Sequence, residues 1–419
     1  MNKIILTILL VVVSAMAFAD YPIQTPKERC DANTFSIMPW GGMYPTGRLF
    51  DKEAMFQDVY DMGFNCSGFI PCEDVNLSLK YNLAPVVEEF PASPDGDPIA
   101  WANKYKEKLG KNADKVFQVY IKDEPFIKDA KWVSGYANAC KNILNARPYI
   151  NMNPNYCDAK TLGGTYTEYL DKFLTGCPVD YVSYDNYSLF AGDYFDEDRF
   201  YSNIEEIRNA AIKHNINFVN IILSVGHFNY ADPSDYNIHV QGWSTLAYGG
   251  KGLSYFLITT PPIGAYRTAA YDRNCHRTPA WTYIQNMNYT IHNLMPYYKN
   301  LKSVNVYHIG DRVPKGCKGV ESSKLMEEVE IGYGGMYRDP AAAYMSALVG
   351  EFVDQDGTPY IILVNKNPKN AMCIGKVKFK GYDNVNIIRD GNYDGVECNF
   401  GGEHKWLAPG HGFLLKAVK

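Results

Sequence analysis

Two carboxylates stand at the ends of short, largely apolar runs in the sequence. Glu124 follows the run at 116–122 (VFQVYIK) and Asp185 follows the run at 181–184 (YVSY). Two carboxyl groups that face one cleft can break a glycosidic bond. One group protonates the departing oxygen, while the other attacks the anomeric carbon or activates a water molecule. Glu124 and Asp185 are therefore the candidate catalytic pair, if the fold brings them together.

The alternation of side chains along a strand indicates which way both carboxylates point. Successive residues of a strand face opposite sides, and the outer side of a barrel strand must be apolar against the covering helices. In the first run Val119 and Ile121 suit the outer side, which leaves Glu124 on the inner side. In the second run Val182 suits the outer side, which leaves Asp185 on the inner side.

Other roles for these acidic residues stay open at this level. Glu124 could form a salt bridge with Lys122, or cap the helix that follows Pro125. Asp185 could orient Glu124 or bind a substrate hydroxyl group instead of reacting. Asp123 is expected to be a helix cap or a group that supports the reacting pair, and we count it among the substrate-binding candidates.

Aromatic and polar residues near the same strand ends could bind a sugar. Aromatic rings stack on sugar rings, and amide, imidazole and phenol groups can hydrogen-bond the sugar hydroxyls. A lone histidine such as His227 can also be an ordinary loop residue. The predicted substrate-binding residues are Trp40, Asp123, Asn153, Tyr184, Tyr187 and His227.

Alternating short β-type runs and amphipathic helical stretches must position these residues. Eight such units, typical of a parallel sheet, fill residues 20–302 and match an α/β fold, the (β/α)8 TIM barrel, in number and length. A doubly wound open sheet is the alternative, but PWGG at 39–42 stands where a nucleotide-binding glycine loop would follow the first strand. The predicted strands are 35–40, 64–70, 84–87, 116–122, 149–153, 181–184, 218–224 and 253–258, and the main helices are 51–62, 99–109, 129–144, 166–174, 199–213, 240–248 and 278–295.

The pattern changes at residue 303 to strands without helices. Turn dipeptides such as Asp356-Gly357 and Asp390-Gly391 separate the runs. This pattern predicts a small C-terminal β-sandwich over residues 303–419 with a structural role, and carbohydrate binding is the alternative role. The predicted strands are 304–308, 347–352, 360–364, 377–379, 385–388 and 413–417.

Residues 1–19 have the pattern of a secretory signal peptide. Lys3 precedes an apolar run at 4–13, and the run is followed by Ala17-Phe18-Ala19, which matches a small-residue cleavage site. A membrane anchor is the alternative, but the run is too short to span a bilayer core of roughly 30 Å. The sequence therefore predicts cleavage after Ala19 and a secreted or periplasmic protein without a membrane span.

Composition limits the partners of the chain. The net charge of −5, with both signs intermixed, disfavours a nucleic-acid or anionic-membrane partner. The high aromatic content, 14% with 33 tyrosines, suits a carbohydrate partner. Ten cysteines in an exported protein predict disulfides, whose pairing the spacing leaves open. No cysteine or histidine spacing is typical of a metal site, so neither metal nor cofactor is predicted, and no oligomeric state is predicted either.

Several motifs, in their order along the chain, resemble bacterial barrel glycosidases. They are IKDEP at 121–125, SYDNY at 183–187, LSVGH at 223–227 and LAYGGKG at 246–252 with Tyr255-Phe256. The chain is similar to β-galactosidase-like glycoside hydrolases, distantly to family 42 and other clan A enzymes. The resemblance implies that Glu124 is the acid/base. It also places a nucleophilic glutamate at the end of the seventh strand, where this sequence has Ser224. Asp185 is then the substitute as nucleophile or base.

Three functions follow from these observations. The leading hypothesis is an exported glycoside hydrolase that cleaves a poly- or oligosaccharide. The alternative is a non-catalytic carbohydrate-binding protein on a barrel that has lost the seventh-strand nucleophile. An esterase ranks last, because the sequence contains no G-x-S-x-G motif for a nucleophilic serine.

Overall fold

The structure is a computed structural model that describes residues 35–43, 51–192, 194–333, 338–389, 396–401 and 405–419. The predicted signal peptide and its cleavage site after Ala19 lie outside the described residues.

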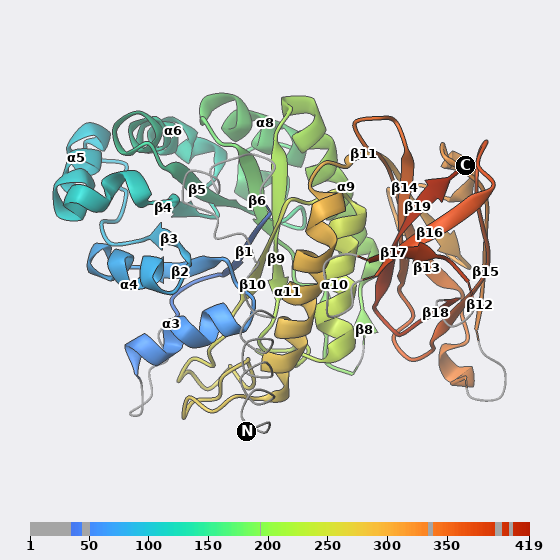
Figure 1. The fold of residues 1–419 in the computed structure, drawn as a ribbon. Helices are drawn as coiled ribbons and strands as arrows, with labels where there is room; N and C mark the ends of the chain where they lie inside the picture. The colour runs from blue at the N-terminus through green and yellow to red at the C-terminus, as the bar shows by residue number, and fades with distance from the viewer. Residues whose placement is uncertain (1–34, 44–50, 193, 334–337, 390–395, 402–404) are drawn as a thin grey trace, which may run out of the picture.

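Eight parallel strands form one sheet, in the order β1-β10-β9-β6-β5-β4-β3-β2. The two end strands meet, because the Asn65 N–H donates to the Ile37 carbonyl at 3.1 Å and Gly42 forms a bridge with Phe69. The sheet therefore nearly closes into a barrel, consistent with the predicted TIM barrel, and helices surround it (Figure 1). The strands are β1 (Ser36–Pro39), β2 (Cys66–Ile70), β3 (Ala84–Val87), β4 (Gln118–Asp123), β5 (Arg147–Met152), β6 (Tyr181–Asp185), β9 (Asn217–Leu223) and β10 (Gly252–Phe256).

The helices begin where the sequence offers capping residues. Thr165 and Glu168 form a reciprocal capping box at α8, and Thr278 caps α11 just before Pro279. All seven predicted helices are present within a few residues, whereas the short helices α4 and α7 were not predicted. The helices are α3 (Lys52–Asp61), α4 (Val75–Lys80), α5 (Pro98–Leu109), α6 (Ala130–Ala139), α7 (Ala159–Leu162), α8 (Tyr166–Gly176), α9 (Glu197–His214), α10 (Asp235–Ala247) and α11 (Pro279–Tyr298).

The barrel strands separate two apolar layers. Val119, Ile121 and Val182 belong to the layer between strands and helices, as the alternation predicted. Phe69, Tyr149 and other inward side chains fill the barrel interior. A short hairpin, β7 (Leu189–Phe190) with β8 (Tyr194–Phe195), extends the loop after β6. Because the interior is filled, a ligand site must lie at a mouth of the barrel.

Two antiparallel sheets follow the barrel. One core unites residues of both sheets, for example Leu363 from the larger and Ile374 from the smaller. The structure thus has the predicted C-terminal strands, together with β12, β17 and β18, which were not predicted. The six-stranded sheet contains β11 (Lys302–Gly310), β13 (Ser346–Val353), β14 (Pro359–Asn365), β19 (Gly412–Val418), β16 (Asn384–Arg389) and β17 (Val396–Asn399); the smaller contains β12 (Met326–Tyr333), β15 (Met372–Phe379) and β18 (Trp406–Leu407).

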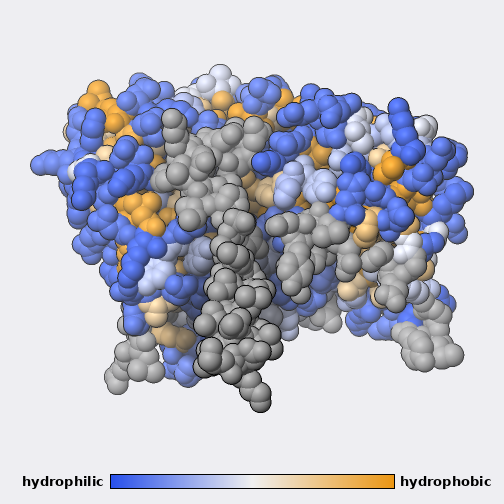
Figure 2. Space-filling model, in the orientation of Figure 1, coloured by the Kyte–Doolittle hydropathy of each residue, from blue (hydrophilic) through white to orange (hydrophobic). Residues whose placement is uncertain are grey.

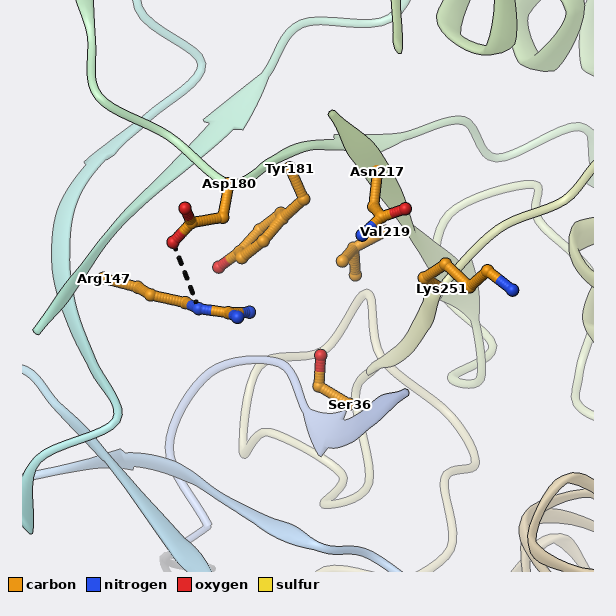
Figure 3. Close-up of a pocket in the computed structure, with 7 residues that line it drawn as sticks. All are labelled: Ser36, Arg147, Asp180, Tyr181, Asn217, Val219 and Lys251. Atoms are coloured by element: carbon orange, nitrogen blue, oxygen red, sulfur yellow. Dashed lines mark ion pairs between the residues drawn. The ribbon is translucent and has the colours of Figure 1, made fainter. Parts of the chain in front are cut away.

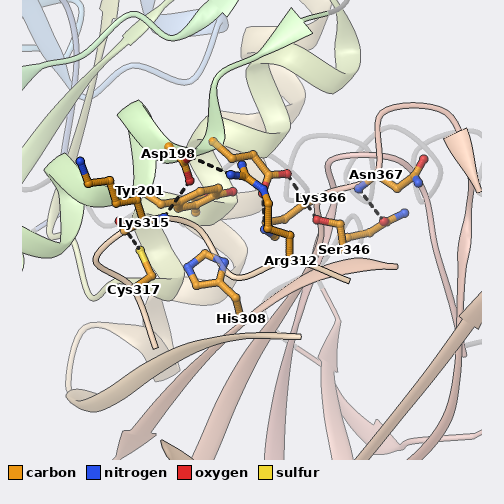
Figure 4. Close-up of polar contacts among 12 residues, drawn as sticks. Asp198, Tyr201, His308, Arg312, Lys315, Cys317, Ser346, Lys366 and Asn367 are labelled. Carbon is orange, nitrogen blue, oxygen red and sulfur yellow. Dashed lines mark hydrogen bonds and ion pairs between the residues drawn. The ribbon is translucent and has the colours of Figure 1, made fainter. Parts of the chain in front are cut away.

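The larger sheet packs directly on the barrel helix α10. Two glycines allow this contact: a Cβ on Gly350 would lie 2.0 Å from the Ala247 carbonyl oxygen, and one on Gly412 would lie 2.5 Å from the Trp243 ring. Beside the apolar contact, the buried Lys366 ammonium pairs with Glu197 at 2.7 Å, and Arg312 pairs with Asp198 at 2.7 Å (Figure 4). Apolar and ionic contacts together join the sheets to the barrel.

The cysteines differ from the prediction. Instead of forming disulfides, seven described cysteines carry free thiols, among them the fully buried Cys140. Burial in apolar surroundings raises the pKa of the Cys140 thiol. Cys72, Cys140 and Cys177 act as small core residues, whereas the other four are partly exposed. The seven are Cys72, Cys140, Cys157, Cys177, Cys275, Cys317 and Cys373.

One face of the described chain is mostly polar. Most residues on the face in Figure 2 are hydrophilic, and hydrophobic residues occur there in small separate groups. Within the described residues, no helix has both the length and the apolar character needed to cross a bilayer.

Candidate active site

One amide joins two acidic residues at the C-terminal mouth of the barrel. The side-chain nitrogen of Asn151 on β5 donates to Asp185 Oδ1 at 2.8 Å and to Asp123 Oδ1 at 3.0 Å. Asp185 ends β6 and Asp123 ends β4, so three neighbouring strands contribute to the cluster. Behind it, Ser183 Oγ donates to Asn151 Oδ1 at 3.2 Å and lies 3.0 Å from the Tyr149 hydroxyl. The amide is therefore fixed from below and orients both carboxylates.

A β-bulge in β4 turns Asp123 toward this cluster. The pairing of β4 with β5 shifts between Tyr120 and Lys122, so that Asp123 lies opposite Asn151. The simple alternation placed Asp123 on the outer face, and the bulge reverses this after Ile121. Asp123 consequently lies beside the candidate pair and does not cap a helix.

Glu124 lies just beyond the strand in a constrained backbone conformation. Its φ angle is +45°, in the left-handed region, and its N–H donates to the Asn151 carbonyl at 2.9 Å. Asn153 holds the next residue, because its side-chain nitrogen donates to the Pro125 carbonyl at 3.0 Å. The Glu124 side chain is solvent-exposed. Within the described chain it forms no ion pair with Lys122, and Asp129 caps the following helical turn instead.

The left-handed conformation of Glu124 makes a stability prediction. Asparagine adopts this region far more readily than other non-glycine residues, whose strain there costs about 1 kcal/mol or more. Glu124→Asn and Glu124→Gln both replace the carboxyl group by an amide. We expect the Asn variant to have the larger free energy of unfolding, by about 1 kcal/mol. Chemical denaturation of the two variants checks this; equal stability would show that the backbone at 124 is not strained.

The carboxyl groups of the mouth share a raised affinity for protons. Although the Glu124 side chain as a whole is exposed, neighbouring residues partly desolvate its carboxyl group, which raises the pKa of Glu124; the charge of Asp123 raises this pKa further, and Lys122 lowers it in part. Burial, followed by the charge of Glu124, raises the pKa of Asp185 well above its usual range. Glu88, at the end of β3, has a raised pKa because of burial and then the charge of Asp123. Such groups hold protons at a pH where ordinary carboxyl groups have lost them, as a general acid requires.

Aromatic rings form a wall beside these carboxylates. Tyr187 stacks on Phe256 with 5.2 Å between ring centroids, and Trp40 lies 5.5 Å from the same Phe256 ring. The buried indole nitrogen of Trp40 has no hydrogen-bond partner among the described residues. Burial, followed by the charge of Asp185, raises the pKa of the Tyr187 hydroxyl, so this phenol is a neutral donor next to that carboxylate. Rings and unpaired donors of this kind suit a sugar.

Three predicted substrate-binding residues are buried among other side chains. Tyr184 is 1% exposed, lies in the layer between strands and helices and faces Phe218, which places it away from the carboxylates of the mouth. Asn153 is engaged with Pro125 and Tyr169, which makes it a positioning residue. His227 is 5% exposed, and its ring stacks on Tyr266 at 5.1 Å. Burial lowers the pKa of His227, so its ring is neutral.

Sequence reasoning missed other members of the site. Asn151 has the same inward parity as Asn153, two residues away, and the parity argument could have found it. The guanidinium of Arg199 lies 3.5 Å from the centre of the half-exposed Tyr156 ring, and this contact joins α9 to the loop after β5. Such a contact leaves no signal in sequence spacing.

The end of the seventh barrel strand carries no carboxylate. β9 ends at Leu223 and is followed by Ser224, whose hydroxyl donates to the Leu257 carbonyl at 3.2 Å. The next residues, Val225 and Gly226, provide no acidic group either. The second carboxylate of the mouth therefore comes from β3, β4 or β6.

A small pocket at the opposite end of the barrel is separate from this site. It is lined by residues at strand starts, including Ser36, Tyr181 and Asn217 (Figure 3). The Arg147 side chain, 5% exposed, pairs there with Asp180 at 3.2 Å. In this fold the N-terminal ends of the strands contribute stability, whereas catalysis occurs at the C-terminal ends.

Comparison with known proteins gives matches only among solved structures. The sequence matches no protein-family model and no curated protein. A β-galactosidase from the psychrophilic Marinomonas ef1 is 8% identical with a TM-score of 0.46, over 65% of this chain and 63% of that chain, less than two thirds of its length. The catalytic domain of a chitinase from Pyrococcus furiosus is 10% identical with a TM-score of 0.41, over 63% and 99% of the chains. An endo-1,4-β-xylanase from Penicillium canescens is 10% identical with a TM-score of 0.39, over 63% and 97%. With TM-scores below 0.5, these likenesses decide neither fold nor activity, which rest on the strands and contacts above.

Proposed function

We propose that this protein is an exported glycoside hydrolase that cleaves O-glycosidic bonds of a poly- or oligosaccharide. The observation that carries the proposal is the cluster in which Asn151 joins Asp123 and Asp185 beside the exposed Glu124, at the mouth of the barrel. Paired carboxyl groups next to aromatic rings suit the cleavage of an acetal linkage.

In this mechanism Glu124 is the general acid. Its exposed side chain can reach the oxygen of the departing sugar, and its raised pKa keeps a proton available. The Glu124 N–H donates to the Asn151 carbonyl, and the Asn153 side chain donates to the Pro125 carbonyl. These bonds hold the backbone at Glu124 and after it, so the carboxyl group is positioned before substrate arrives.

Asp185 is the second carboxylate of the reaction. The charges of Glu124 and Asp123 disfavour ionisation of Asp185, and the charge of Asp123 disfavours ionisation of Glu124, so protons are shared within the cluster. In the reactive form of the cluster the proton lies on Glu124 and Asp185 is ionised, so Asp185 serves as nucleophile or as the base for water when Glu124 gives its proton to the leaving oxygen. Retention at the anomeric carbon identifies a nucleophile, and inversion identifies a base. Asp123, Trp40 and Tyr187 contact the sugar.

The test is sugar release from a panel of polysaccharides, oligosaccharides and aryl glycosides. We expect new reducing ends from at least one of them. One observation favours a second function, a non-catalytic carbohydrate-binding protein: Ser224 stands where the resemblance places a nucleophile. Binding of an oligosaccharide without any release would establish that alternative.

Activity should depend on the charges that surround Glu124. A general acid must be protonated, so kcat/KM should fall as pH rises through the pKa of Glu124. Replacing Lys122 by Met removes a positive charge that lowers this pKa, and should move the basic limb of the pH profile to higher pH. Asp123→Asn removes a negative charge that raises it, and should move the limb to lower pH. Shifts in the same direction for both variants would show that Glu124 does not control this limb.

The remaining assignments complete the proposal. Cleavage after Ala19 would deliver the protein to the periplasm or the exterior, where polysaccharides occur. Residues 20–302 are the catalytic domain, and residues 303–419 are a β-sandwich that supports it.

A further inference from the structure

Two histidines and an aspartate meet where helix α10 begins against the C-terminal sheet. Asp235 and His239 lie one turn apart on α10, and His411 lies on the turn before β19. His411 Nε2 is 2.9 Å from Asp235 Oδ2, and His239 Nδ1 is 3.2 Å from Asp235 Oδ1. One possible ligand atom from each residue lies within 4.8 Å of the other two. The three side chains thus converge on one point.

The backbone fixes the approach of His411. Its N–H donates to the Ala408 carbonyl at 3.2 Å, and its own carbonyl accepts from the Asn365 N–H at 2.9 Å. The preceding Gly410 has φ of +79°, and a Cβ there would lie 2.8 Å from the Tyr236 carbonyl oxygen. Only glycine therefore lets this turn sit against the first turn of α10. Backbone contacts therefore hold His411 in place, and they do not involve its contact with Asp235.

The side chains have the surroundings of an open metal site. His239 is 1% exposed, and its ring stacks on that of His411 with 4.0 Å between centroids and 16° between planes. The Asp235 side chain is 49% exposed, so water can reach the cluster from one side. Two imidazole nitrogens and a carboxylate oxygen form a ligand set that Zn²⁺ accepts, with water in the fourth position.

We propose that Asp235, His239 and His411 bind a divalent transition-metal ion, Zn²⁺ in the first place, which fastens the C-terminal sheet to helix α10. The bound ion ties a helix of the barrel to the turn before β19, next to the glycine contact at Gly412. Because the ion binds only the folded arrangement, it stabilises the protein in proportion to its concentration above Kd. The site is independent of the carboxylates at the barrel mouth.

The test is titration of the full chain, freed of metal with EDTA, by ZnCl2 in a calorimeter, with Co²⁺ absorption as a second probe. We expect one ion per chain and a higher midpoint of thermal unfolding in the presence of zinc. His411→Ala and Asp235→Asn should each weaken zinc binding at least about tenfold. His411 is partly exposed, so its variant remains a valid test if the buried His239→Ala does not fold.

A matched control is available on helix α9. His214 Nε2 lies 2.8 Å from Asp171, but Lys213 takes the place of a second histidine on that carboxylate. His214→Ala should leave zinc affinity unchanged. The proposal is overturned if the parent binds no stoichiometric zinc, or if His411→Ala and Asp235→Asn bind it as tightly as the parent. In either case the three residues form only a hydrogen-bonded cluster.

Discussion

Replacing Glu124 by glutamine is expected to lower kcat/KM on an unactivated oligosaccharide by about 10²- to 10⁴-fold, the usual contribution of a general acid. The amide keeps the size of the side chain and its exposed place at the mouth. It has no proton acidic enough for the leaving oxygen. Oligosaccharide affinity should change little, because the variant keeps the aromatic wall.

The loss should depend on the leaving group. A dinitrophenolate departs without protonation. We therefore expect the kcat/KM values of the parent and of Glu124→Gln for the dinitrophenyl glycoside to differ by less than about tenfold. Glu107→Gln, on the exposed face of helix α5, is the control for loss of a carboxylate elsewhere. An equal loss on all leaving groups would indicate that Glu124 acts on binding or folding and not as the acid.

Replacing Asp185 by asparagine is expected to remove activity and increase stability together. Asp185 is 6% exposed and faces the charges of Glu124 and Asp123, so its ionised form is costly in the folded protein. Asparagine keeps an oxygen that accepts from Asn151 and carries no charge. We expect a loss of activity of at least about 100-fold and a gain in the free energy of unfolding of about 1–3 kcal/mol at neutral pH.

The gain should depend on pH with a defined sign. The folded-state pKa of Asp185 is raised, so the folded protein still holds the proton where the unfolded chain has lost it. The contribution of Asp185 to the stability of the parent is therefore fully present below the pKa that it has in the unfolded chain. This contribution is lost as the pH rises through the folded-state pKa. Unfolding curves of the parent and Asp185→Asn should coincide most closely in acid and separate as the pH approaches neutrality. A variant less stable than the parent at neutral pH would contradict this account.

Asp180 at the start of the same strand is the matched control. It pairs with Lys141 and with the buried Arg147 at the opposite end of the barrel (Figure 3). Asp180→Asn should destabilise the protein, because it removes the carboxylate from a buried guanidinium, and should leave activity unchanged. Loss of activity with a gain in stability for Asp185→Asn, and unchanged activity with a loss of stability for Asp180→Asn, would show that only the C-terminal end of β6 serves catalysis.

Periodicity predicted most of the fold. The barrel strands are regular apolar runs and the helices are amphipathic, so local pattern and tertiary burial agree. β12 was missed although Val329, Ile331 and Tyr333 alternate with other residues, because Glu327, Glu328 and Glu330 make the segment polar. The free thiols were mispredicted because cysteine number reports the compartment and not the burial of each side chain.

The site was predicted in part, and for a reason that needs correction. Alternation along β4 placed Glu124 inward, but the bulge reverses the alternation, and Glu124 reaches the mouth because it follows the end of the strand. Asp185 obeys the simple rule. The pairing of His411 with Asp235 depends on how the C-terminal sheet packs on α10, which no local pattern encodes.

The most direct test of the account compares sugar release by the parent and by Glu124→Gln from the best unactivated substrate, with binding of that substrate measured on both. We predict steady release by the parent, a rate at least about 100-fold lower for the variant, and similar affinities. Binding by both proteins with no release by either, or equal release by both, would contradict the assignment of Glu124 as the catalytic acid of a glycoside hydrolase.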